Sequence, residues 1–148
     1  MPSEWRQFRR VQFSETDVAG LVHFSNFFRY FEDAEHALWR AAGLSIHPEQ
    51  SAIGWPRVSA SCEFHRPLRF EQEFEVAVRI AELGKRTISY VGEISGDGHR
   101  IATASWKIAC VKKLADGTMK STIIPSEVVE RFASVAIPAS NLEPPTSS

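Results

Sequence analysis

One short polar loop of this sequence holds residue types that could carry out chemistry. It runs from Asp17 to Asn26, contains Gly20 and His23, and leads directly into an aromatic-rich segment. If that segment is a helix, its first amides lack internal acceptors and carry partial positive charge, so they can hold a developing oxyanion. Gly20 permits a tight turn that returns the Asp17 carboxylate towards those amides.

A carboxylate beside an oxyanion hole is sufficient for acyl transfer. Asp17 can attack an acyl carbon, or it can align and deprotonate a water molecule. A thioester suits this minimal set of groups, because a thiolate with a pKa of roughly 8.5 leaves without a strong general acid. By residue type alone, the plainer interpretation is that Asp17 is a turn or cap residue and that His23 makes a structural hydrogen bond.

The segment after the loop is predicted to be a helix. Ser25 or Asn26 can cap its first turn with a side-chain oxygen, and Gly43 stands where a left-handed C-terminal cap is expected. Apolar residues recur at helical spacing and form one stripe, namely Phe27, Tyr30, Phe31, Ala34, Leu38 and Ala41. Because the stripe begins with aromatic residues, we expect the helix to lie against a sheet.

Strands are predicted on both sides of this helix. A first strand is expected to end near Ser14, because residues 11–13 are rich in apolar residues and follow Trp5 and Phe8. A short last strand is expected around residues 119–123, before a helical turn. Between them, apolar residues alternate with a period of two in the segments 58–64, 76–80, 88–94 and 102–110. Turn sequences separate most of these runs, at residues 83–85, 96–98 and 116–117. The expected fold is α+β, with a curved antiparallel meander wrapped around the helix.

Length and composition fit one cytoplasmic domain. The 148 residues are predicted to form a single domain over 1–137, with a disordered tail rich in Pro, Ser and Thr at 138–148. A net charge of −1 disfavours a broad nucleic-acid surface, and neither a membrane span nor a signal peptide is found. Cys62 and Cys110 are expected to be free buried thiols, as in a reducing cytosol. The motifs of nucleotide-binding proteins, metal-histidine sites and serine hydrolases are missing.

The loop and the start of the helix resemble the signature of the 4-hydroxybenzoyl-CoA thioesterase family. Residues 16–32 contain an Asp, two residues, Gly, an aliphatic pair, an aromatic pair, a small residue and Asn, followed by an aromatic-rich helix. The resemblance continues through 56–58 and 62–70, and it covers most of 11–124. It implies a hotdog fold, a long helix wrapped by a curved antiparallel sheet. It also implies hydrolysis of a small, medium or aromatic acyl-CoA, with no cofactor and no metal.

The resemblance also implies roles for residues of the loop. Asp17 matches the catalytic aspartate of the family, as nucleophile or general base. The implied oxyanion donors are backbone N–H groups at the start of the helix, with Phe24 as first choice and Ser25 as second. His23 departs from the Tyr or Trp of many relatives; it either replaces an aromatic wall or binds near the thioester sulfur.

Basic residues elsewhere are candidates for the phosphates of CoA. Lys85 and Arg86 fall where relatives carry nucleotide-binding residues, Arg66 is a further candidate, and Gly20 is expected beside the substrate. For each cation, a solvated surface charge is the alternative interpretation. The resemblance further implies a homo-oligomer, a dimer or a homotetramer, with active sites at the subunit interface.

Two other functions stay open at this point. One is a non-catalytic hotdog module that binds acyl-CoA, and the other is a thioesterase for acyl-carrier protein, which shares the phosphopantetheine arm with CoA. A hotdog hydratase is disfavoured, because Val18-Ala19 follows the aspartate where those enzymes use a different, Asn-Pro-containing pattern.

Overall fold

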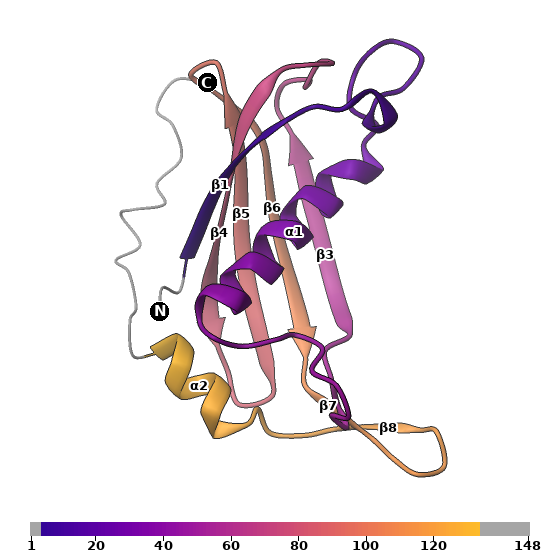
Figure 1. Cartoon of the computed structure of the whole chain (residues 1–148), viewed down its shortest axis with the longest axis vertical. Coiled ribbons are helices and arrows are strands. Elements are labelled where there is room, and N and C mark those ends of the chain that lie inside the picture. Colours follow the sequence, from indigo (N-terminus) through magenta and orange to yellow (C-terminus); the bar gives the residue numbers. More distant parts are fainter. Residues whose placement is uncertain (1–3, 134–148) are drawn as a thin grey trace.

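A long helix lies across one face of a curved antiparallel sheet (Figure 1). The computed structural model describes residues 4–133, so the predicted domain end at 137 and the tail 138–148 lie outside them. The sheet has the strand order β1-β4-β5-β6-β3. Its elements are α1 (Ser25–Ala41), β1 (Glu4–Arg10), β3 (Arg57–Phe64), β4 (Glu73–Leu83), β5 (Thr87–Gly96) and β6 (His99–Ala109). This is the expected α+β arrangement.

A second, smaller sheet stands at the end of the molecule where α1 ends. It has the order β2-β7-β8, and its elements are β2 (Ile53–Gly54), β7 (Val111–Lys113) and β8 (Met119–Ser121). The short helix α2 (Ser126–Ala133) covers the same end, where the rings of Phe132 and Trp39 lie 5.2 Å apart. Within residues 4–133, neither helix is long and apolar enough to cross a membrane.

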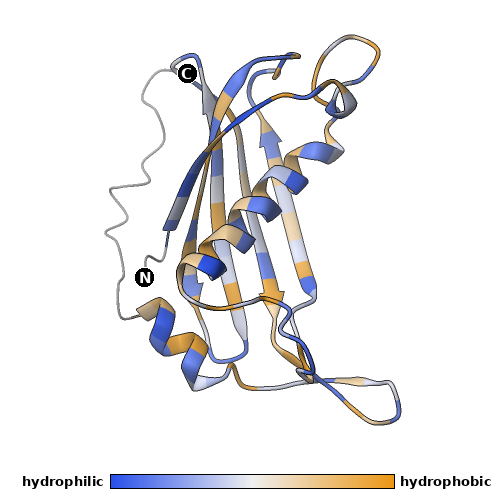
Figure 2. Cartoon of the chain, in the orientation of Figure 1, coloured by the Kyte–Doolittle hydropathy of each residue, from blue (hydrophilic) through white to orange (hydrophobic). Residues whose placement is uncertain are grey.

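The hydrophobic core fills the space between α1 and the inner face of the sheet. Hydrophobic and hydrophilic residues alternate along α1 and along β4, β5 and β6, so each of these elements buries one face, whereas β3 is exposed along most of its length (Figure 2). The largest fully buried side chains include Tyr30, Phe31, Leu38, Trp39, Phe74, Ile88, Tyr90, Ile94 and Ile108. Burying one such apolar side chain contributes about 1.5–3 kcal/mol. The predicted helical stripe is therefore confirmed, and so is the predicted alternation in β4, β5 and β6.

Gly92 allows α1 to approach the middle of the sheet closely. A Cβ atom at this position would lie 2.6 Å from Cδ1 of Phe31 and 3.0 Å from the ring of Trp106. No side chain fits at that distance without moving its neighbours. Glycine here sets the spacing between the helix and β5.

A charged pair crosses from the helix to β3 inside this layer. The carboxylate of Glu35 is fully buried, and Arg57 donates to it over 2.6 Å and to Glu32 over 2.8 Å. Beside it, Trp39 donates to the hydroxyl of Tyr90 over 2.9 Å. Removing one partner of such a buried pair is strongly destabilising, because the other charge is left uncompensated.

Three local predictions were wrong. The first strand ends at Arg10 rather than near Ser14, and residues 13–15 form a 3-10 helix, η1 (Phe13–Glu15). No side chain caps α1: the Ser25 hydroxyl instead contacts His23, and the side-chain amide of Asn26 donates to the backbone carbonyl of Glu15. The strands are also not one simple meander, since β3 pairs with β6 rather than with its successor β4.

The reason for the changed strand order is the connection between β3 and β4. The turns after β4 and β5 are tight, and Gly98 has a φ of +75°. The residues between Phe64 and Glu73 contain no tight-turn sequence, and they cross the end of the sheet instead. As a result, β3 is an edge strand next to β6.

The predicted cap at Gly43 is confirmed, with a φ of +76°, and both cysteines are free.

Candidate active site

The loop that carries Asp17 is closed by backbone hydrogen bonds. The amide of Asp17 donates to Leu21 over 2.7 Å, and that of His23 donates to Glu15 over 2.9 Å. The chain reverses at Gly20, whose φ is +78° and whose amide donates to the Asp17 carbonyl over 3.1 Å. The loop is therefore a small closed turn held at both sides, and glycine is needed at its tip.

The Asp17 carboxylate is exposed, and its two oxygens have different surroundings. Oδ1 accepts hydrogen bonds from the amides of Ala19 over 2.8 Å and of Leu21 over 3.2 Å, which fix the side chain within its own loop. Oδ2 has no donor within residues 4–133. Asp17 is thus a turn residue, as its residue type alone predicts, and its Oδ2 is left for chemistry.

The start of α1 offers one unoccupied backbone donor. The N–H of Phe24 has no acceptor among the described residues, whereas the N–H of Ser25 donates to Nδ1 of His23 over 3.3 Å. The same Nδ1 lies 2.8 Å from Oγ of Ser25, and the His23 ring lies beside that of Phe24. Since a backbone amide can only donate, Nδ1 is the acceptor in this contact, and Nε2 is the ring nitrogen that faces away from it.

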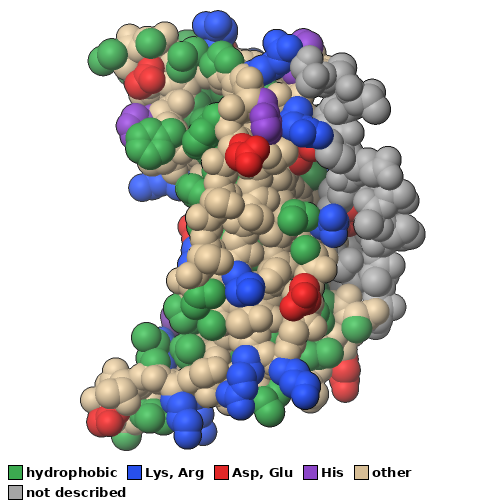
Figure 3. All heavy atoms as spheres, turned by 180° about the vertical axis from the view of Figure 1, so that it is seen from behind, with side chains coloured by type: hydrophobic (Ala, Val, Ile, Leu, Met, Phe, Trp, Pro, Cys, Tyr) green, Lys and Arg blue, Asp and Glu red, His purple; other side chains and the backbone are tan. Residues whose placement is uncertain are grey.

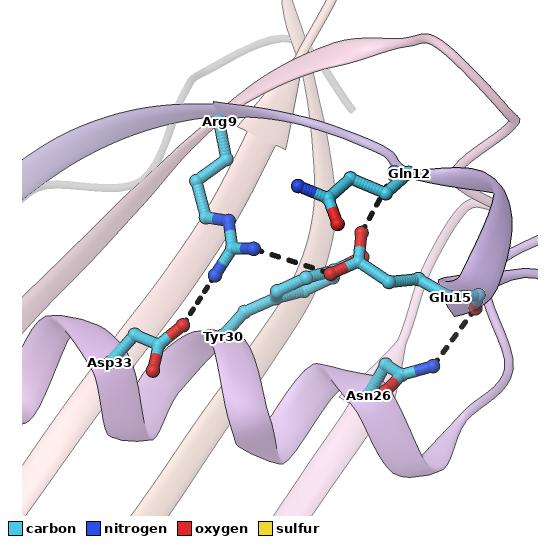
Figure 4. A network of polar contacts seen from close by, with 6 residues as sticks. All are labelled: Arg9, Gln12, Glu15, Asn26, Tyr30 and Asp33. Atoms are coloured by element: carbon cyan, nitrogen blue, oxygen red, sulfur yellow. Dashed lines mark hydrogen bonds and ion pairs between the residues drawn. The ribbon is translucent and has the colours of Figure 1, made fainter.

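Glu15 joins this loop to the rest of the fold (Figure 4). Its Oε1 accepts from Tyr30 over 2.8 Å and from the Gln12 amide over 2.9 Å, and its Oε2 accepts from Arg9 over 3.2 Å. Its backbone carbonyl accepts from Asn26 over 2.9 Å. Burial and the contact with Glu15 raise the pKa of the Tyr30 hydroxyl, which therefore stays protonated and donates.

Arg9 extends this network along the helix. It also pairs with Asp33 one turn beyond Tyr30, and its guanidinium lies 4.9 Å from the centre of the Tyr30 ring (Figure 4). Strand β1, the loop and α1 are thus held together by one set of charged and hydrogen-bonded groups. Glu15 was missed from the sequence, because a glutamate before a polar loop has no distinctive pattern.

Asp17 lies on one wall of a pocket of about 420 Å³ between the loop, α1 and the end of β3. The rings of Phe27 and Phe64 meet edge to face there, with centres 5.0 Å apart. The lining is mostly apolar and consists of Asp17, Leu21, Val22, His23, Phe24, Phe27, Phe64, His65, Arg66 and Pro67. A carboxylate on the wall of a largely apolar pocket is a suitable place for an acyl group to react.

The pocket brings together some of the predicted residues. Asp17, His23, Phe24 and Arg66 line it, while Gly20 shapes the loop behind them. His65 was not foreseen; its Nε2 lies 3.0 Å from Oγ1 of Thr103, and its position in an alternating strand gave it no special signal.

Lys85 and Arg86 are far from this pocket in the same chain. They lie in the turn between β4 and β5, at the opposite end of the molecule from the Asp17 loop (Figure 1). Helix α1 runs from one end towards the other and is itself about 25 Å long, at about 1.5 Å per residue. A single chain therefore does not assemble the full set of predicted residues.

The chain matches a known protein family over most of its length. The model of the Thioesterase-like superfamily matches residues 11–132. A protein of Aquifex aeolicus named "Putative esterase" is 37% identical over 132 residues, which are 88% of this chain and 97% of that protein. A 1,4-dihydroxy-2-naphthoyl-CoA hydrolase of Synechococcus elongatus is 26% identical over 110 residues, covering 72% of this chain and 81% of the relative.

Solved structures show the same fold. A gentisyl-coenzyme A thioesterase superposes with a TM-score of 0.74 and 27% identity, over 86% of this chain and 99% of that one. The 4-hydroxybenzoyl-CoA thioesterase of Pseudomonas sp. strain CBS-3 superposes with a TM-score of 0.77 at 18% identity, over 87% and 99%. The latter likeness establishes the fold, which is the hotdog fold.

Proposed function

This chain belongs to the thioesterase-like superfamily and is a thioester hydrolase, and from that premise we propose that it hydrolyses an acyl-CoA in the Asp17 pocket. The observation that carries the proposal is the pairing of a free carboxylate oxygen on Asp17 with an unoccupied amide on Phe24, both lining one pocket. The products are the free acid and CoA.

Asp17 supplies the reactive carboxylate through Oδ2. In one route Oδ2 attacks the thioester carbon, the carbon–sulfur bond breaks, and water then hydrolyses the mixed anhydride. In the other route Oδ2 takes a proton from a water molecule as that water attacks. The bonds from Ala19 and Leu21 to Oδ1 keep the side chain in place for either route.

The oxyanion is assigned to the N–H of Phe24. This amide is free and precedes the positive end of α1, so it can stabilise negative charge on the former carbonyl oxygen. The amide of Ser25 is the weaker candidate, because His23 already accepts from it. His23 in turn presents Nε2–H, which can donate to the departing sulfur.

The acyl group is proposed to be aromatic. Phe24, Phe27 and Phe64 supply flat apolar walls, which favour a ring over a flexible chain. The named relatives act on 1,4-dihydroxy-2-naphthoyl-CoA and gentisyl-CoA, both of which carry aromatic acyl groups.

The active unit is proposed to be a pair of chains joined through β3. This strand is the edge of the large sheet, yet Val58 and Phe64 on it are 55% and 51% exposed. An exposed apolar edge strand invites pairing with another strand. Pairing two copies of β3 antiparallel would continue the sheet and place the Arg57 end of one copy beside the Phe64 end of the other.

That pairing would complete the site. Lys85 and Arg86 lie at the Arg57 end of the molecule, so those of one copy would approach the Asp17 pocket of the other. They could then bind the phosphates of CoA. A tetramer would add packing through the back of the sheet, where small residues such as Ala77 and a hollow of about 250 Å³ are found.

The decisive experiment is thiol release from a panel of aliphatic and aromatic acyl-CoA thioesters and acyl-carrier-protein thioesters. Asp17→Asn is expected to lower kcat at least about a thousandfold while circular dichroism and CoA binding are retained. Asp97→Asn, an exposed turn aspartate at left-handed φ, is the matched control and should keep full activity. Undiminished turnover in Asp17→Asn would refute the assignment. CoA-ester binding without turnover in the unaltered protein would instead identify a binding module.

A further inference from the structure

A smaller cavity lies between α1 and the sheet, further along the helix than the Asp17 pocket. Its volume is about 140 Å³, close to the roughly 150 Å³ of a protein cavity that holds a benzene ring. Its walls include Phe28, Phe31 and Glu32 from α1 and Arg57, Ala60 and Trp106 from the sheet. Three aromatic side chains thus surround a space that suits part of a flat ring.

The indole of Trp106 brings a hydrogen-bond donor without an acceptor to this cavity. Trp106 is 4% exposed, and its Nε1 is buried and has no partner within residues 4–133. A Cβ atom on Gly92 of β5 would lie 3.0 Å from Cζ3 of the indole, so the Cζ3 edge faces β5. Nε1 is on the opposite edge of the ring, which therefore points away from β5, towards Ala60 of β3 and the cavity. Because a buried donor without an acceptor is destabilising, a ligand atom that accepts from it is bound strongly.

Arg57 adds further donors without making the cavity positive. Its Nη2 donates to Glu32 over 2.8 Å and to Glu35 over 2.6 Å, while its Nη1 and Nε have no acceptor in the described part of the chain. Two carboxylates around one guanidinium leave an excess of negative charge, which repels a ligand group that is itself an anion. The cavity therefore favours an uncharged oxygen that accepts hydrogen bonds, such as that of a hydroxyl, an ether or a ketone.

Within one chain, this cavity is closed off from the Asp17 pocket. The rings of Phe27 and Phe64 touch at the inner end of that pocket, and the residues of the cavity lie beyond them along both α1 and β3. An acyl group beside Asp17 cannot pass between two rings in contact. The cavity that it can reach belongs to a second copy.

The β3 pairing proposed above places the two spaces side by side. The Arg57 end of one copy would lie beside the Phe64 end of the other, at the usual strand spacing of about 4.8 Å. Ala60 and Phe64 point to the same face of β3, so the pocket of one copy and the cavity of the other open on the same side of the joined sheet. Seen from behind, the molecule is hollowed along the flank that carries β3, which leaves room for the second copy (Figure 3).

We propose that Trp106 and Arg57 of one copy determine the acyl specificity of the Asp17 pocket of the paired copy. They donate hydrogen bonds to an uncharged oxygen on the acyl ring, at the end remote from the thioester. This inference rests on the proposed function and on the β3 pairing. Trp106 and Arg57 act on binding and take no part in breaking the thioester bond.

The test uses two substrates that differ in one atom. Benzoyl-CoA thioesters carrying a methoxy or an ethyl group at the same ring position, meta or para, have the same size, but only methoxy accepts a hydrogen bond. We expect kcat/KM to be about tenfold higher for the methoxy substrate. Trp106→Phe, which keeps a ring but lacks the N–H, should bring this ratio close to one. The ratio should be the same when pantetheine, which has no phosphate, replaces CoA, because the cavity contacts only the acyl end.

Two further variants make the test specific. Trp55→Phe is the matched control, since Trp55 also packs against another ring, that of Trp39 at 5.0 Å, but lines neither space; it should keep the tenfold ratio. Ala60→Val narrows the cavity at an exposed strand position and should lower kcat/KM about tenfold for both substituted substrates.

Mixed pairs of Asp17→Asn and Trp106→Phe chains test the contribution of the second copy. In such a pair one site carries both changes and the other carries neither, so the preference for methoxy should return. No return of the preference, an unaltered ratio in Trp106→Phe, or an equal loss in Trp55→Phe would each overturn the proposal. Failure of the proposed function is distinguishable, because the unaltered protein would then release no thiol. Calorimetric Kd values for CoA thioethers with the same two rings would still test the cavity.

Discussion

The two ends of this molecule treat their charges in opposite ways. Around the Asp17 loop, Glu15 alone accepts hydrogen bonds from Tyr30, Gln12 and Arg9, so the charged groups behind the loop are fixed in place. At the opposite end, which carries the β4–β5 turn and the β7–β8 hairpin, the lysines have no carboxylate partners among residues 4–133. Bond-making chemistry requires groups held within a fraction of an ångström, whereas phosphate binding needs only a concentration of positive charge.

The largest effect should come from loosening the fixed end. Glu15→Ala leaves the Tyr30 hydroxyl and the Gln12 amide without their acceptor and leaves Arg9 with Asp33 alone, and each lost acceptor costs about 1–3 kcal/mol. We expect kcat to fall about thirtyfold with little change in KM, and Glu15→Gln, which still accepts from Tyr30, to restore most of it. Steady-state kinetics on purified variants measures both.

The matching change at the other end is Asp116→Ala. Asp116 holds the tip of the hairpin by accepting from the amide and hydroxyl of Thr118, over 2.9 Å and 2.6 Å. If kcat depends on the fixed end alone, this variant keeps its turnover. A comparable loss of kcat in both alanine variants would abolish the distinction between the two ends.

The next effect concerns stability. Gly92→Ala forces a Cβ against the ring of Phe31 at 2.6 Å, and overpacking of this kind costs about 1–3 kcal/mol. Gly54→Ala, beside the hairpin, places its Cβ 3.4 Å from Val111 and should change stability by less than about 0.5 kcal/mol. Urea denaturation of the two variants compares the helix–sheet layer with the small sheet. Equal midpoints would show that α1 and β5 have more freedom to separate than their contact indicates.

The smallest effect is the response to salt. Raising the ionic strength from about 0.1 M to about 1 M shortens the Debye length from about 10 Å to about 3 Å. The KM for acyl-CoA should then rise about fivefold, while the KM for acyl-pantetheine and the value of kcat stay constant. Salt-dependent kcat would mean that the Asp17 end, too, relies on exposed charge.

The elements that depend on local pattern could be predicted from the sequence. The apolar spacing of residues 27–41 predicts α1, and the alternation after residue 57 predicts the strands. Gly43 marks the end of the helix. The cap of α1 could not be predicted in the same way. Ser25 and Asn26 are good capping residues, but both use their side chains for contacts to His23 and Glu15, which only the folded loop brings near.

Non-local features were beyond the sequence for a different reason. The position of β3 beside β6 depends on how residues 65–72 cross the sheet, and no local preference encodes that. The burial of Glu35 could not be predicted, because its partner Arg57 lies on another element. Likewise, Asp17 and Lys85 each matched a pattern, but only the fold shows that they stand at opposite ends of a chain.

The edge strand β3 has a consequence for the length of the substrate. In the proposed pairing, the register between the two copies sets how far Lys85 and Arg86 of one copy lie from the other copy's pocket. A slip of one residue would turn every side chain to the opposite face, and a slip of two would move Lys85 and Arg86 by about 7 Å. The strand register would then act as a ruler for the carrier arm between thioester and phosphates. The aromatic walls around Phe27 and Phe64 could change to suit new acyl groups without altering that measured distance.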